Sequence, residues 1–144
     1  LRRPTLHEVM GLAMSPGLTN YILEEVSELP LQPTSVENLW LLCSGTKPPN
    51  PADMLGAARM DMIIARLTEQ ADIVLFDAPP VMAAADAAIL GAKADGVLLV
   101  IQAGKTRRDH SERAREILEK AKARIVGATL TNAPKDGALG EYYG

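Results

Sequence analysis

The chain has 144 residues, of which 47% are hydrophobic and 3% aromatic, and its formal net charge is −3 at pH 7. This length suits one domain whose core is built mostly from aliphatic side chains. The mildly acidic balance argues against a nucleic-acid partner, and no apolar run approaches the roughly 18–20 residues of a membrane span. The single cysteine, Cys43, cannot form an internal disulfide and fits a reducing cytosol.

Short elements separated by breakers are predicted in the first half of the chain. Helices are expected at residues 5–12 and 18–26, a strand at 39–43, and a longer helix from 51 to about 69. Ser15-Pro16-Gly17 separates the first two helices. Asn50 is placed to cap the long helix, with Pro51 at its first position.

Strands and helices alternate in the second half. Strands are predicted at residues 72–77, 96–101 and 125–131, with helices at 84–93 and 107–123. This alternation predicts an α/β fold with a mostly parallel sheet and flanking helices. Thr106 is placed to cap the last helix in a capping-box arrangement with Asp109. We expect one domain over 1–132 and a flexible, Gly-rich tail over 133–144.

The octet Ile-Val-Leu-Phe-Asp-Ala-Pro-Pro at 73–80 is the most informative segment. Its four apolar residues suit a strand buried on both faces, and Asp77 stands at the carboxyl end, where parallel sheets bind ligands. Pro79 and Pro80 then prevent a ladder or helix from continuing. A Walker B aspartate reaches nucleotide-bound magnesium from such a place, and a solvated Asp before a turn is the alternative. Asp86 could support Asp77, although capping the next helix is its more ordinary role.

Several short segments follow one another in an informative order. They are Leu1-Arg2-Arg3-Pro4, Pro48-Pro49-Asn50-Pro51-Ala52, the octet at 73–80, Ala85-Asp86-Ala87, Ala94-Asp95-Gly96 and the closing Glu141-Tyr142-Tyr143-Gly144. In this order and spacing the chain resembles the cytoplasmic domain of the bacterial tyrosine kinases (BY-kinases) of capsule and exopolysaccharide systems, relatives of the MinD/ParA ATPases. The resemblance covers essentially the whole chain. It implies a P-loop NTPase-like fold, which is a Rossmann-like three-layer arrangement.

The chain departs from this family at its start. Family domains open with a Walker A phosphate loop and a Walker A′ strand, whereas this sequence begins at the Leu-Arg-Arg-Pro that follows them. Gly104-Lys105-Thr106 is no substitute, because Leu99 stands where the loop needs its first glycine. We therefore expect the C-terminal part of a kinase domain, inactive alone and poor at binding ATP. Its sheet, without the phosphate-loop strand, should self-associate or close up in another order.

The resemblance also implies roles for individual residues. Asp77 would be the catalytic carboxylate that holds Mg²⁺, and Pro79 would shape the turn beneath it. Asn132 would hydrogen-bond the adenine edge of ATP, a task for which an amide both donates and accepts; an ordinary loop start is the alternative. Tyr142 and Tyr143 would be the phosphoacceptors, since family members carry a C-terminal tyrosine cluster. A frayed terminus without a role is the alternative for this pair.

Together these features predict part of an ATP- and Mg²⁺-dependent protein-tyrosine autokinase. It would regulate polymerisation and export of a capsular polysaccharide, exopolysaccharide or lipopolysaccharide. The implied partners are a membrane-embedded chain-length determinant or activator and further copies of the protein, at the cytoplasmic face of the membrane. Two other classes stay open, namely a MinD/ParA-type positioning ATPase, which would not need the tyrosine pair, and a non-catalytic module that docks on the chain-length determinant.

Overall fold

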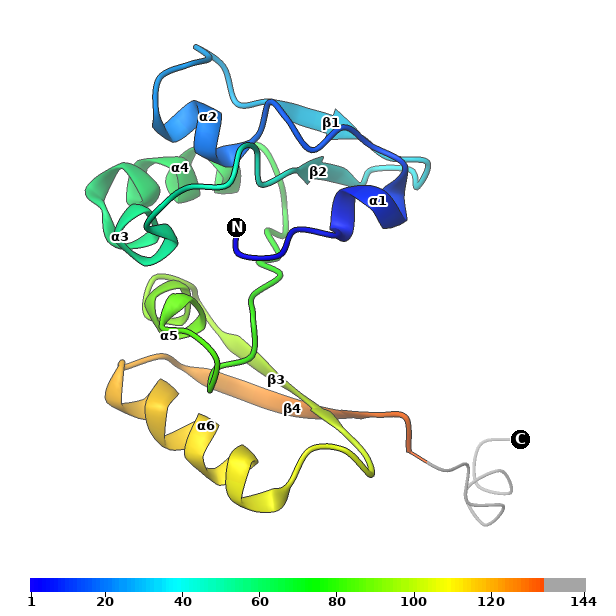
Figure 1. Ribbon diagram of the computed structural model, residues 1–144, viewed down its shortest axis with the longest axis vertical. Coiled ribbons are helices and arrows are strands. Elements are labelled where there is room, and N and C mark those ends of the chain that lie inside the picture. Colours follow the sequence, from blue (N-terminus) through cyan, green and yellow to red (C-terminus); the bar gives the residue numbers. More distant parts are fainter. Residues whose placement is uncertain (134–144) are drawn as a thin grey trace. The chain divides into compact units, whose positions relative to one another are not determined.

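The computed structural model describes residues 1–133 of the chain. The fold divides into two compact units, Leu1–Asp77 and Ala78–Gly144. Helices accompany a small antiparallel sheet in the first unit and a small parallel sheet in the second (Figure 1). The predicted α/β class is thereby confirmed.

The first unit contains four short helices and one strand pair. In chain order these are α1 (Leu6–Met10), α2 (Leu18–Ile22), β1 (Leu31–Pro33), β2 (Trp40–Leu42), α3 (Pro51–Gly56) and α4 (Ala58–Thr68). Strands β1 and β2 pair antiparallel, with Leu31 opposite Leu42. The β1 strand was not predicted, and it is only three residues long and ends in a proline. Asn38 lies in the connection with a φ of 60°, a left-handed conformation that asparagine tolerates.

The long helix predicted from 51 to about 69 is two helices. Asn50 and Pro51 hold the predicted cap and first positions, although the Asn50 side chain makes no capping bond. Helix α3 ends at Gly56, and Ala57 has extended backbone before α4 begins. Glycine is a poor residue for a helix interior, which explains a break at this point.

The core of the first unit rests on one face of α4. Met60, Ile63 and Leu67 are buried there, with exposed fractions of 1%, 2% and 8%. Their spacing of three and four residues places them on one side of the helix. Met62 of the same helix is instead 64% exposed, so it does not belong to this buried face.

The second unit is a strand–helix–strand crossover preceded by a helix. Its elements are α5 (Asp86–Gly91), β3 (Val97–Gln102), α6 (Arg108–Lys120) and β4 (Ile125–Thr131). Strands β3 and β4 are parallel, with Leu99 opposite Ala128, and α6 provides the long connection that parallel strands need. Leu118 of α6 has no exposed surface and is the centre of the core of this unit. Thr106 does not cap α6 as predicted, because its Oγ1 accepts a hydrogen bond from the backbone N–H of Gln102 at 3.0 Å.

The predicted strand at 72–77 is absent as regular structure. Ile73 and Leu75 of this segment are 76% and 85% exposed. A strand exists only through hydrogen bonds to a neighbouring strand, and none of the four described strands pairs with this segment. The strand prediction for 72–77 was therefore wrong, because a strand needs a partner from elsewhere in the chain and the local sequence does not supply one.

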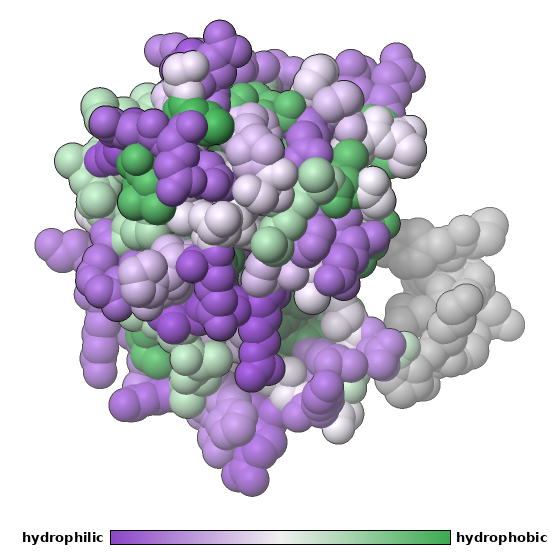
Figure 2. All heavy atoms as spheres, turned by 45° about the horizontal axis from the view of Figure 1, so that its top comes forward, coloured by the Kyte–Doolittle hydropathy of each residue, from purple (hydrophilic) through white to green (hydrophobic). Residues whose placement is uncertain are grey.

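Apolar side chains also reach the surface elsewhere. Leu98, Val100 and Leu130 of the β3–β4 pair are 57%, 62% and 57% exposed. In the view of Figure 2, apolar residues emerge in scattered places among hydrophilic ones. Among residues 1–133, no helix has both the length and the apolar character needed to cross a bilayer.

Candidate functional site

Asp77 is the last residue of the first unit and lies in backbone without regular structure. It is exposed, and its carboxylate has no hydrogen-bond or ion-pair partner among residues 1–133. The chain turns soon afterwards, where the Pro80 carbonyl accepts a bond from Ala83 N–H at 2.8 Å. Pro79 is half-buried and directly precedes this turn. A carboxylate left open in this way can accept hydrogen bonds from the water shell that Mg²⁺ retains in proteins.

Asp86 occupies the first position of α5, and Ala85 is the N-cap residue. No side-chain capping bond forms there, so the cap predicted for Asp86 was wrong. Instead the residue is almost fully enclosed, with 2% of its surface exposed. Buried carboxylates are costly unless polar or charged groups surround them, which makes this residue part of the packing of α5. The sequence offered no signal for this burial.

Asn132 directly follows β4 and is exposed. Its φ of 59° is left-handed, a conformation in which asparagine is favoured among residues with a side chain. The Thr131 carbonyl accepts a bond from Ala103 N–H at 2.8 Å, so Asn132 lies beside the loop that leaves β3. This is the carboxyl edge of the parallel pair, where ligands of such sheets bind. Asn132 therefore lies at the carboxyl edge of the β3–β4 pair, and its role toward adenine stays a prediction.

The loop after β3 contains Gly104-Lys105-Thr106. Gly104 has a left-handed φ of 71°, and the Thr106 hydroxyl is engaged with Gln102 within the loop. A phosphate loop instead needs successive backbone N–H groups that cradle the anion, with the hydroxyl directed at the metal. The geometry of this loop therefore supports the interpretation that Gly104-Lys105-Thr106 is not a Walker A phosphate loop.

The predicted site residues fall in different parts of the chain. Asp77 belongs to the first unit, while Pro79 and Asn132 belong to the second. Tyr142 and Tyr143 lie outside the described residues. Within residues 1–133 no three His, Cys, Asp or Glu side chains gather as a metal site. A metal at Asp77 would therefore have one protein carboxylate and otherwise water and phosphate oxygens, which is a usual arrangement for Mg²⁺.

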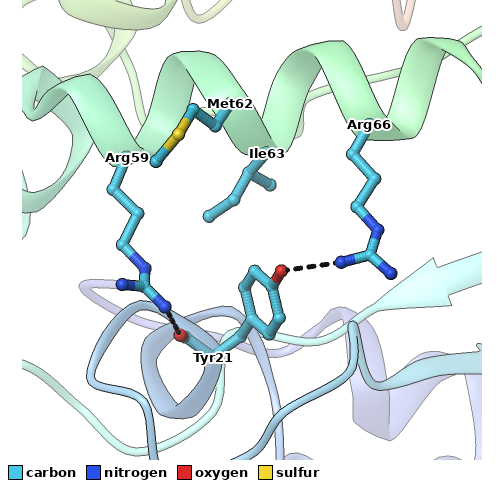
Figure 3. Close-up of a pocket in the computed structure, with 5 residues that line it drawn as sticks. All are labelled: Tyr21, Arg59, Met62, Ile63 and Arg66. Carbon is cyan, nitrogen blue, oxygen red and sulfur yellow. Dashed lines mark hydrogen bonds between the residues drawn. The ribbon is translucent and has the colours of Figure 1, made fainter.

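Sequence reasoning missed a pocket in the first unit. Figure 3 shows Tyr21 of α2 facing Arg59, Met62, Ile63 and Arg66 of α4. The Tyr21 hydroxyl accepts a hydrogen bond from Arg66 Nη1 at 3.0 Å. The backbone carbonyl of Tyr21 accepts another from Arg59 Nη2 at 3.2 Å. The seven-residue spacing of the two arginines is visible in the sequence, but the docking of α2 against them is not.

No protein-family model matches the chain. Among curated proteins, it is 39% identical over 143 residues to the tyrosine-protein kinase YwqD of Bacillus subtilis, covering 99% of this chain and 60% of that protein. Among solved structures, it matches the chimerical protein CapA2B2 with a TM-score of 0.88 and 27% identity, over 93% of this chain and 60% of that one. The kinase domain of the Escherichia coli tyrosine kinase ETK gives a TM-score of 0.83 and 27% identity, over 94% of this chain and 55% of that one.

In each of these three comparisons, the similarity extends over almost the whole of this chain. They also show that it spans only about 55–60% of the length of each of these three chains. The resemblance to the bacterial tyrosine kinases is therefore confirmed for the part of those proteins that this chain covers.

Proposed function

Since this chain corresponds in sequence and in fold to part of the bacterial tyrosine-protein kinases, we propose that the whole protein is an ATP-dependent protein-tyrosine autokinase. The observation that carries the proposal is the 39% identity, over 99% of this chain, to a protein named as a tyrosine-protein kinase. The similarity to the ETK kinase domain supports it independently, because it rests on the arrangement of the backbone. Both relatives are kinases, which favours this reading over a positioning ATPase.

The proposed residue roles follow the geometry of each residue. Asp77 would hold Mg²⁺ through its unpartnered carboxylate, and Pro79 would shape the backbone that follows it. Asn132 presents its amide to the adenine edge from the carboxyl end of β4. The left-handed backbone at Asn132 supports this role, because it ends the strand and leaves the side chain at the edge of the sheet.

The proposed reaction moves the γ-phosphoryl group of ATP to a tyrosine hydroxyl of a neighbouring copy, with Tyr142 and Tyr143 as acceptors. A bond forms between the tyrosine oxygen and phosphorus, the bond to the bridging oxygen of ADP breaks, and the phenol proton passes to a carboxylate. Bound Mg²⁺ would supply charge stabilisation for the phosphoryl group. Because this sequence has no Gly-rich phosphate loop, we expect the 144-residue chain to be inactive by itself.

The wider role is proposed on the resemblance alone. The protein would regulate polymerisation and export of a capsular polysaccharide, exopolysaccharide or lipopolysaccharide. It would act at the cytoplasmic face of the membrane, with a membrane-embedded chain-length determinant as activator and other copies of itself as substrates.

Autophosphorylation of the whole protein tests the proposal. With ATP and Mg²⁺, mass spectrometry should find phosphate on Tyr142 and Tyr143, and Asp77→Asn should abolish it. Asp109→Asn is the matched control, since Asp109 is an exposed aspartate paired with Arg107 away from the proposed roles. Phosphorylation that survives Asp77→Asn, or that occurs only on Tyr21, would refute the assignment.

A further inference from the structure

The pocket between α2 and α4 is built from one helix face and one tyrosine. Arg59, Met62, Ile63 and Arg66 recur at spacings of three and four along α4, so their side chains project on the same side. Tyr21 faces them from α2 (Figure 3). Ile63 is 2% exposed and lies at the bottom of the pocket, whereas Met62 is 64% exposed and can contact a bound molecule. Each of these residues lies in the first unit.

The two arginines of this pocket differ in how their charge is compensated. Arg59 forms an ion pair with Glu24 through Nη1, and its Nη2 donates to the Tyr21 carbonyl. Its guanidinium carbon lies 5.7 Å from the centroid of the Tyr21 ring. Arg59 therefore holds α2 against α4, and Glu24 neutralises it.

Arg66 has no such counter-charge. Its Nη1 donates to the Tyr21 hydroxyl at 3.0 Å, while Nε and Nη2 have no partner and no carboxylate pairs with it among residues 1–133. Because the Tyr21 oxygen accepts this bond, its own proton can be donated elsewhere. One end of the pocket thus presents a guanidinium and a phenol hydroxyl, which are hydrogen-bond donors suited to an oxyanion.

An apolar surface adjoins these donors. Met62 and Ile63 line the pocket, and a methionine thioether makes favourable contacts with aromatic rings. Inorganic phosphate would use the donors only, and an Asp or Glu side chain would bring no ring to the apolar part. An aryl phosphate uses both parts, because its ring is bonded directly to its anionic group.

We propose that this pocket binds a phosphotyrosyl side chain of another polypeptide. The phosphate oxygens accept hydrogen bonds from Arg66 and from the Tyr21 hydroxyl, and the ring packs on Met62, beside the buried Ile63. Recognition of phosphate by arginine with its planar array of donors is a recurring mode of phosphopeptide binding. The inference rests on the proposed kinase function only for the supply of phosphotyrosine. The pocket would hold a phosphorylated neighbour against the first unit.

Binding is measured on the 144-residue chain by NMR titration, with phenyl phosphate and a short phosphotyrosyl peptide as probes. We expect saturable shifts of the amide signals of residues 21 and 66, and at least fivefold weaker binding of inorganic phosphate and of the matching phosphoseryl peptide. Arg66→Gln should weaken phenyl phosphate binding at least tenfold, and Tyr21→Phe several-fold. Arg113→Gln, at an exposed helical arginine paired with Glu116, should leave it unchanged.

Equal affinity for inorganic phosphate and phenyl phosphate would overturn the proposal, as would binding that survives Arg66→Gln. Arg66 is exposed, so its replacement should not unfold the chain, and thermal melting of each variant checks this. The titration needs neither ATP nor phosphoryl transfer. If the autophosphorylation test fails, the result of the binding titration therefore still holds. If the titration fails, the kinase assignment still holds.

Discussion

Gly17 and Gly45 approach so closely that a Cβ atom on Gly17 would lie 2.2 Å from the backbone nitrogen of Gly45. The contact joins the start of α2 to the chain leaving β2. Two hydrogen bonds flank it, from Leu18 N–H to the Cys43 carbonyl at 2.8 Å and from Thr19 N–H to the Ser44 carbonyl at 2.9 Å. Because backbone rather than a flexible side chain meets the added atom, the structure has little room to adjust.

Gly17→Ala should therefore destabilise the chain by about 2 kcal/mol or more, as forced overpacking does elsewhere. Gly56→Ala is the matched control, since a Cβ at Gly56 meets nothing within 4 Å and alanine is the better helix former. Urea unfolding measures both variants. Equal midpoints for Gly17→Ala and the unmodified chain would show that the two segments can separate at little cost.

Burial raises the pKa of the Cys43 thiol above its ordinary value, against a smaller opposing effect of the hydrogen bond from Gln32. The unfolded thiol thus loses its proton at lower pH than the folded one. The resulting contribution to stability is complete below about pH 8.5 and is lost as pH rises through the folded pKa. The free energy of unfolding should fall more steeply above that pH in the unmodified chain than in Cys43→Ala. Identical slopes in chemical denaturation would contradict this.

The isolated 144-residue chain should bind ATP·Mg²⁺ with a dissociation constant in the millimolar range or weaker. Phosphate anchoring in P-loop proteins comes from loop N–H groups and a lysine, and this sequence has no such loop. Isothermal titration calorimetry measures the constant. A micromolar value would mean that the phosphate site lies elsewhere in the chain.

The isolated chain should also self-associate through its sheets. Leu98 and Val100 of β3 and the segment at 72–77 expose apolar side chains, and such surfaces invite pairing with another chain. Light scattering should show a mass that grows with concentration. Val100→Lys should reduce this growth, and Val9→Lys, at an exposed valine of α1, is the control. A monomer at all concentrations, with the strand order of the relatives intact, would refute the argument.

The segment at 72–77 shows where sequence reasoning reaches its limit. Its apolar run is a local property, and it correctly marks a segment suited to a sheet interior. Whether it forms a strand depends on a partner that satisfies its N–H and C=O groups, and no local pattern contains that information. The same limit applies to α4, where apolar residues occur on more than one side and only packing selects Met60, Ile63 and Leu67 as the buried set.

The sequence by itself determined the α/β class, the order of most helices and strands, the breaks at proline, and the family resemblance. Each of these depends on residue type and near-neighbour spacing, which the chain carries directly. The tertiary structure alone decided the antiparallel β1–β2 pair, the burial of Asp86, the left-handed end of β4 at Asn132, and the pocket between Tyr21 and Arg66. The strand pair, the burial and the pocket arise when residues distant along the chain meet, and the end of β4 depends on where its pairing with β3 stops. Their energies depend on the distances and burial that only the folded backbone sets.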